Sequence, residues 1–121
     1  MRKLIVSAQV SLDGVVEAPE RWAAPFWDDP GAYRYALDEL RGAGALLMGR
    51  RTYEAFLGYW PQAPDDDPMT TLMNQLPKHV ASTTLSTPEW NATVIAEPAT
   101  LRLTESRTLP SGVTVLFYAT A

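Results

Sequence analysis

The sequence predicts an α/β protein in which helices flank a partly parallel sheet and a β-hairpin closes the chain. Two observations support this class. Segments rich in β-branched residues alternate with segments of helical periodicity, which is typical of parallel strands joined by crossover helices. Near the end of the chain, two strand-like segments flank residues 109–112 (LPSG), which is typical of an antiparallel hairpin. With 121 residues, we expect a single domain over 1–121.

The first third of the chain predicts a strand, a turn, a loop and a helix. Residues 3–10 (KLIVSAQV) indicate a central strand, and residues 11–14 (SLDG) a turn in which Gly14 takes a positive φ. Residues 18–30 hold three prolines, two tryptophans and a phenylalanine, which favours an aromatic loop. The helix should present an apolar face to the core, formed by Tyr33, Ala36, Leu37 and Leu40.

The remaining elements follow from apolar runs and breaker residues. Residues 45–48 (ALLM) are continuously apolar, which predicts a parallel strand covered on both faces. A helix should then run from Thr52 to about Tyr59. After an acidic loop at 61–68, we expect a short helix over 69–76, strands over 78–84 and 90–96, and the terminal hairpin strands over 100–108 and 113–119.

Composition excludes several classes of function. The formal net charge of −4 argues against nucleic acid as a partner, and the absence of cysteine excludes disulfides and thiolate metal sites. The acidic loop lacks the spacing of a calcium site, so we expect no metal. No apolar run approaches the length of a membrane span, and the first residues lack the pattern of a signal peptide. We therefore expect a cytoplasmic protein with no membrane partner.

Residues 49–52 (GRRT) follow an apolar strand and open a helix, which is a natural place for an anion. Gly49 lets an anion approach the backbone, and the guanidinium groups of Arg50 and Arg51 match phosphate oxygens in pairs. Thr52 can cap the helix or donate to a phosphate. The alternative is that both arginines are simply solvated, since a threonine cap and a glycine at a strand end are common in proteins.

Four segments together resemble the dihydrofolate reductase-like family, and most closely its bacterial branch that shares a domain with the reductase of riboflavin biosynthesis. They are 6–16 (VSAQVSLDGVV), 46–61 (LLMGRRTYEAFLGYWP), 76–85 (LPKHVASTTL) and 101–118 (LRLTESRTLPSGVTVLFY). The resemblance implies a mixed sheet of parallel strands and a C-terminal antiparallel hairpin, with NADPH as cofactor. It assigns the phosphates of NADPH to Gly49, Arg50, Arg51 and Thr52, and the adenosine 2′-phosphate to Ser82, Thr83 and Thr84, with Lys78 nearby.

The same resemblance implies a pocket for nicotinamide and substrate at the start of the chain. Ala8 and Gly14 would line the cofactor, and Gln9 the substrate. Asp13 would bind a polar NH group or assist protonation, although an aspartate in a turn more simply satisfies its own backbone. The aromatic loop would cover a flat ring through Trp22, Phe26 and Trp27, or form an oligomer contact. Four further aromatic residues, Tyr33, Tyr53, Phe56 and Tyr118, are predicted in the core.

The chain departs from the family pattern between about 96 and 99, where a helix, a glycine turn and further elements are missing. The first strand therefore needs a new neighbour, supplied by the terminal hairpin or by another subunit. We expect a homodimer, formed in one arrangement by strand exchange.

The resemblance implies an NADPH-dependent reductase of the 5-amino-6-(5-phosphoribosylamino)uracil reductase type. It would transfer hydride to a small heterocyclic or sugar-phosphate substrate. The missing glycine turn keeps a second hypothesis open, a catalytically silent relative that binds a nucleotide or acts as an oligomeric module.

Overall fold

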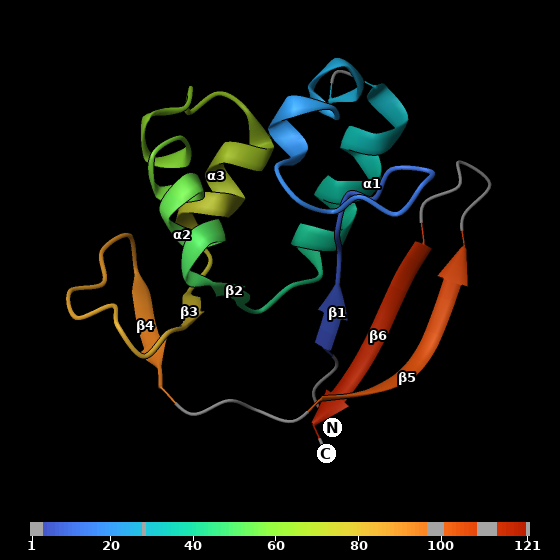
Figure 1. The fold of residues 1–121 in the computed structure, drawn as a ribbon. Helices are drawn as coiled ribbons and strands as arrows, with labels where there is room; N and C mark the ends of the chain where they lie inside the picture. The colour runs from blue at the N-terminus through green and yellow to red at the C-terminus, as the bar shows by residue number, and fades with distance from the viewer. Residues whose placement is uncertain (1–3, 28, 97–100, 109–113, 121) are drawn as a thin grey trace. The chain divides into compact units, whose positions relative to one another are not determined.

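The computed structural model describes residues 4–27, 29–96, 101–108 and 114–120. These residues form two compact units (Figure 1). One unit comprises Pro30–Pro98, and the other combines Met1–Asp29 with Ala99–Ala121. The expected class, helices with a small parallel sheet and an antiparallel hairpin, is confirmed. The parallel and antiparallel strands belong to two separate three-stranded sheets, however, and not to one mixed sheet.

The unit of residues 30–98 alternates helices with parallel strands. Its sheet has the order β2-β3-β4, and in it Met48 lies beside Val80, which lies beside Val94. The elements are α1 (Pro30–Arg41), β2 (Leu46–Gly49), α2 (Arg50–Leu57), the 3₁₀ turn η3 (Trp60–Gln62), α3 (Pro68–Gln75), β3 (Lys78–Ala81) and β4 (Ala92–Ile95).

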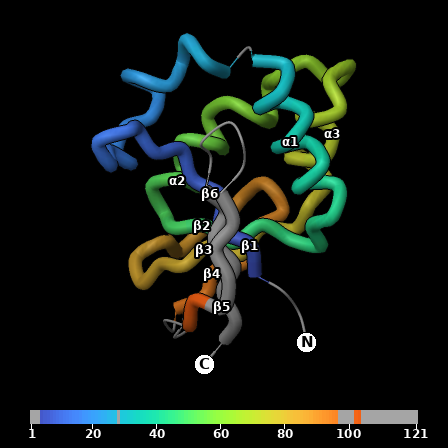
Figure 2. The backbone as a smooth tube through the Cα atoms, turned by 90° about the vertical axis from the view of Figure 1, so that its right-hand side faces the viewer, coloured from blue at the N-terminus to red at the C-terminus, as the bar shows by residue number. Residues whose placement is uncertain are grey.

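Two apolar clusters hold this unit together. Leu37 of α1 packs with Met69 and Met73 of α3, so that α1 and α3 lie side by side (Figure 2). In the second cluster, Tyr53 of α2 packs on Met48 and Val80 of the sheet. The predicted apolar face of α1 is confirmed, as is the burial of the tyrosine in α2.

Among the described residues of the unit 30–98, helices cover one face of the parallel sheet. Met48 and Val80 face the helices, whereas Leu47 on the opposite face of β2 is 47% exposed. Ala81 and Ile95, at the ends of β3 and β4, are exposed as well. Within this unit the prediction of a strand covered on both faces is not met for β2, because a run of apolar residues does not reveal how many layers cover it.

Asp67 joins α1 to α3. It is the N-cap residue of α3, where its carboxylate accepts hydrogen bonds from the backbone N–H of Thr70 (2.9 Å) and from the Thr70 hydroxyl (3.1 Å). The Tyr33 hydroxyl of α1 donates to the same carboxylate. One member of the acidic loop is thus a structural residue that satisfies the end of a helix.

The second unit is built on an antiparallel sheet with the order β1-β6-β5. Its strands are β1 (Leu4–Val6), β5 (Leu101–Thr108) and β6 (Thr114–Thr120), and the β5–β6 pairing is irregular between Leu103 and Glu105. The hairpin strands are confirmed, and the predicted turn at 109–112 lies outside the described residues.

The first strand obtains its neighbour from the terminal hairpin, since Leu4 pairs with Tyr118. The expectation of a central strand is wrong in this sheet, where β1 is a short edge strand. Residues 7–10 form no regular element, and the turn after them places Gly14 at a φ of 91° as predicted. The aromatic loop contains two 3₁₀ turns, η1 (Pro19–Arg21) and η2 (Ala24–Phe26).

Candidate functional site

The junction of β2 and α2 exposes the N-terminus of a helix. Gly49 ends β2 and is the N-cap residue of α2, with extended backbone angles (φ −77°, ψ 165°). No side chain caps this end of the helix. The first N–H groups of a helix have no partner within it, and a Cβ added at Gly49 would meet no heavy atom within 4 Å. The junction therefore has room and donors for an anion.

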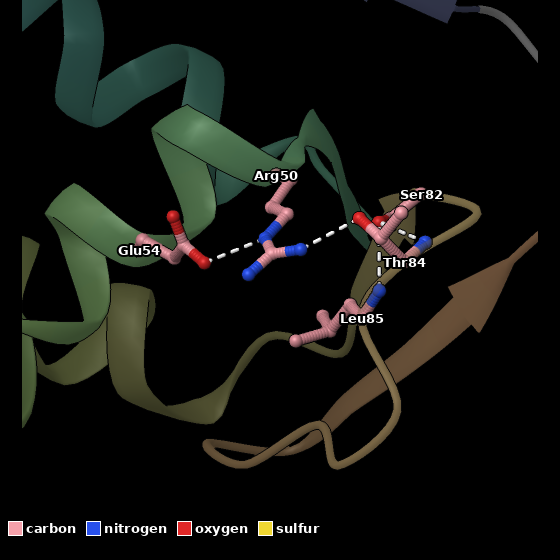
Figure 3. Close-up of polar contacts among 5 residues, drawn as sticks. All are labelled: Arg50, Glu54, Ser82, Thr84 and Leu85. Carbon is pink, nitrogen blue, oxygen red and sulfur yellow. Dashed lines mark hydrogen bonds and ion pairs between the residues drawn. The ribbon is translucent and has the colours of Figure 1, made fainter.

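Arg50 lies at the first position of α2 and is oriented from two sides (Figure 3). Its Nε donates to Glu54 Oε1 (2.7 Å) and its Nη1 donates to Thr84 Oγ1 (2.6 Å). These contacts use two of the five N–H donors of a guanidinium. Because the Arg50 and Glu54 side chains are 44% and 49% exposed, the ion pair adds little stability. Its effect is to fix the direction of the guanidinium.

The loop after β3 folds around the Ser82 hydroxyl. Ser82 Oγ accepts the backbone N–H groups of Thr84 (3.2 Å) and Leu85 (3.1 Å), and the Ser82 N–H donates to the Ile95 carbonyl (3.1 Å). Thr83 and Thr84 are exposed. Since Gly49 and Ala81 are paired in register, the loops after β2 and β3 leave the same edge of the sheet. The structure thereby brings Arg50 together with the hydroxyl residues that the sequence assigned to the adenosine end.

Thr52 does not have its predicted position. The helix begins at Arg50, two residues earlier than expected, so Thr52 is the third helical residue and cannot be the cap. Arg50 and Arg51 are consequently part of the helix and do not precede it. Both Arg51 and Thr52 are exposed in this first turn.

A comparison with protein-family models finds that residues 2–115 match the RibD C-terminal domain. The chain belongs to the RibD C-terminal domain family. This family is of the riboflavin-biosynthesis reductase type, and its model spans the α2 junction, the loop after β3 and both compact units. No curated protein matches the chain.

Two of the residues expected near nicotinamide and substrate, Gln9 and Trp27, are in contact in the structure. Trp27 Nε1 donates to Gln9 Oε1 (3.1 Å), which holds the indole ring beside the end of the first segment. Trp27 is 47% exposed and Phe26 is 68% exposed, so both rings present a face to solvent. Ala8 and Gly14 are also exposed.

Trp22 lies half-buried beside an open hollow of ≈ 440 Å³. Its Nε1 donates to the Glu17 carbonyl (3.1 Å), which leaves the ring as an apolar wall. The hollow is also lined by Val15, Ala18 and Arg21. A wall of this kind suits a flat ring, which is the role the resemblance gives to Trp22.

The surroundings of Asp13 favour its ionised form, whereas a proton donor needs surroundings that favour the protonated form. The Ser11 hydroxyl donates to Asp13 Oδ1 (2.6 Å) and, with the backbone N–H of Asp13 itself, lowers the pKa of this carboxyl below its usual value. The side chain is exposed, so it stays ionised near neutral pH. An exposed carboxyl with a lowered pKa does not fit a partly buried acid that holds its proton, and the contact with Ser11 agrees with a turn aspartate. The ionised carboxylate can still accept a hydrogen bond from an NH group.

Lys78 does not lie near the presumed 2′-phosphate site. It begins β3 and is fully buried, whereas Ser82 follows the other end of that strand. Its Nζ donates to the Asn74 carbonyl (3.2 Å) near the end of α3 and lies 3.9 Å from the centroid of the Trp90 ring. Burial lowers the pKa of this amine. Lys78 is thus a structural cation that satisfies a helix C-terminus.

The part of the chain that the structure describes supports neither a metal site nor a membrane-spanning helix. No group of three or more His, Asp or Glu side chains there is arranged to hold a metal ion. Within the same residues, no helix has the length and apolar character needed to cross a membrane.

The residue that the sequence left out of the site is Tyr53. As an aromatic residue it was predicted in the core, and it is 1% exposed. Its hydroxyl, however, reaches the loop between β3 and β4, where it contacts the backbone of Glu89. The sequence indicates only that a buried tyrosine hydroxyl needs a hydrogen-bond partner. No local pattern identifies that partner.

Proposed function

We propose that this chain binds NADPH and uses it to reduce a small heterocyclic or sugar-phosphate substrate. The observation that carries the proposal is the Arg50 guanidinium, held between Glu54 and Thr84 at the N-terminus of α2. A fixed guanidinium beside a helix N-terminus is a strong site for a phosphate group. Membership of a reductase family supplies the reaction type.

The residues present fit the phosphates of such a cofactor. Gly49 leaves space beside the helix end, and Arg50 keeps donors available for phosphate oxygens. Thr83 adds an exposed hydroxyl on the neighbouring loop, and Arg51 an exposed cation. In the other unit, Gln9 orients the Trp27 ring, whose exposed face suits stacking with a flat substrate.

In the proposed reaction, bound NADPH supplies the hydride and the protein positions the two rings. Arg50 and the helix N-terminus would hold the negative charge of the cofactor, which keeps its position fixed while the substrate exchanges. Asp13, ionised and exposed, would act as an acceptor for an NH group of the substrate and not as an acid. We place the protein in the cytoplasm, since it has no disulfide that requires an oxidising compartment.

A second candidate function follows from the connection between β4 and β5. β4 ends at Ile95 and β5 begins at Leu101, so the segment between them is too short for a helix and a further strand. If the glycine turn expected there is needed to hold the diphosphate, the chain would be a silent relative that binds nucleotides weakly. An assay of NADPH consumption over reducible heterocycles distinguishes the two functions.

The binding test is a calorimetric titration of NADPH into wild-type protein, Arg50→Ala and Arg41→Ala. Loss of a charged hydrogen bond to phosphate should weaken binding about 10- to 100-fold in Arg50→Ala. Arg41→Ala removes the same charge from an exposed pair with Asp38 on α1 and should bind as wild type does. Equal affinities for all three proteins would refute the Arg50 site.

A further inference from the structure

Tyr53 makes an unusual paired contact with a single residue of a distant loop. Its hydroxyl donates to the Glu89 carbonyl (3.0 Å) and accepts the Glu89 backbone N–H (2.8 Å). The ring is 1% exposed, packed between Met48 and Val80. The Tyr53 hydroxyl therefore both donates to and accepts from the backbone of one residue. Through this contact the buried side chain holds the β3–β4 loop (residues 82–91) against α2.

The same face of α2 contacts the loop at a second point. Arg50 and Tyr53 are three residues apart, so both project from one side of the helix. Arg50 meets the loop at Thr84, and Tyr53 meets it at Glu89. Between these points Leu85 packs against the cluster that contains Tyr53, while its N–H donates to Ser82 Oγ. The position of the Ser82–Thr84 hydroxyl groups is thus tied to the Tyr53 ring.

The far end of the loop is anchored separately. Trp90 Nε1 donates to Asn74 Oδ1 (2.7 Å), and Lys78 Nζ lies over the Trp90 ring. Loss of the Tyr53 hydroxyl should therefore release residues upstream of Trp90 and leave the rest of the unit in place. Because Glu89 is exposed, water can satisfy its N–H and carbonyl groups after such a change.

We infer that Tyr53 is a positioning residue for cofactor selection: it fixes the β3–β4 loop so that Ser82, Thr83 and Thr84 meet the adenosine 2′-phosphate. This inference rests on the proposed NADPH site and adds to it a buried residue that cannot itself touch the cofactor. The hydroxyl groups at 82–84 supply the contacts, and Tyr53 determines where they lie. A cofactor without the 2′-phosphate should not depend on this arrangement.

The test compares NADPH and NADH binding to wild-type protein, Tyr53→Phe and Tyr59→Phe by calorimetry. Tyr59→Phe is the matched control, because Tyr59 follows the same helix but is 61% exposed and contacts Trp60 instead of the loop. We expect Tyr53→Phe to weaken NADPH binding about tenfold, the equivalent of one or two net hydrogen bonds, and to leave NADH binding unchanged. Amide spectra should show faster hydrogen exchange at Glu89 and shifted Thr84 and Leu85 signals in this variant alone.

The possible results separate the two proposals. A reduced preference for NADPH over NADH in Tyr53→Phe, with unchanged behaviour of Tyr59→Phe, supports the inference. Equal weakening of both cofactors, or no change in either together with unshifted Thr84 and Leu85 signals, overturns it while the NADPH site stands. If the wild-type protein binds no NADPH, the proposed function fails and the role of Tyr53 in cofactor selection fails with it.

Discussion

The contact between Asp67 and its neighbours allows a sharp test of how α1 and α3 are joined. In Asp67→Ala, α3 loses its N-cap acceptor and the Tyr33 hydroxyl loses its partner. Asp67→Asn keeps one side-chain oxygen that can accept from Thr70, but it removes the charge and replaces the second oxygen, which accepts from Tyr33, by an NH2 group. The neighbouring Asp66 is exposed and provides the matched control Asp66→Ala.

The expected loss of unfolding free energy in Asp67→Ala has two contributions. Removing an aspartate cap costs about 1 kcal/mol. The hydrogen bond from Tyr33 to a charged but half-exposed carboxylate adds about 1 kcal/mol after its partial exposure to solvent is considered. Asp67→Ala should therefore lower the free energy of unfolding by about 2 kcal/mol, and Asp67→Asn by about half of that. Asp66→Ala should change it by less than about 0.5 kcal/mol.

The pH dependence gives the experiment a second readout. Hydrogen bonds from Tyr33 and Thr70 hold the pKa of Asp67 below its ordinary value of 3.8. The stabilisation is thus fully present above pH 3.8 and is lost as the pH falls through the lower, folded-state pKa. The difference between wild type and Asp67→Ala should shrink under these acidic conditions.

Urea unfolding followed by far-UV circular dichroism measures this difference, because α1, α2 and α3 all lie in the unit of residues 30–98. A cost for Asp67→Ala no greater than that for Asp66→Ala would refute the reasoning. So would a cost that stays constant from neutral to strongly acidic pH.

Two further predictions concern the buried lysine and the oligomeric state. Since burial lowers the pKa of Lys78 below 10.5, the unfolded state binds more protons between the two values, and wild type should gain stability over Lys78→Met as the pH rises toward 10.5. A difference in unfolding free energy that does not vary with pH would contradict this. We also propose a homodimer, because β1 is paired on one side only in its sheet and an edge strand can accept another chain. Light scattering during dilution should show dissociation, and a constant monomer mass would exclude the dimer.

The regular elements were predictable because their signals are local. The spacing of Tyr33 and Leu37 identified α1, and the β-branched terminal segments identified the hairpin. The predicted start of α2 is two residues late because Thr52 is itself a candidate cap, although glycine is about as favourable as threonine at this position. Here the backbone already turns at Gly49.

The features that were missed depend on residues far apart in the sequence. Whether β1 is central or at an edge is decided by its pairing with β6. The resemblance implied that Lys78 lies near the 2′-phosphate, but the side chain is buried beside Trp90, which lies in the loop after β3. The Arg50–Thr84 contact joins the two segments, 49–52 and 82–84, that the resemblance assigned to one cofactor. The Tyr53–Glu89 contact could not be anticipated, since a tyrosine hydroxyl can bond any nearby backbone group.

The pairing of β1 with β6 has a consequence for the order in which the protein forms. Leu4 pairs with Tyr118, so β1 must wait for a strand that is made after the whole unit of residues 30–98. All contacts between α1, α2, α3 and the parallel sheet involve residues 30–98 and can form earlier during synthesis. Pairing two segments this far apart in the sequence is slow in comparison with such local contacts. The β1-β6-β5 sheet should therefore assemble only after β6 has been made, and until then Leu4–Val6 lacks the partner strand that it has in the folded protein.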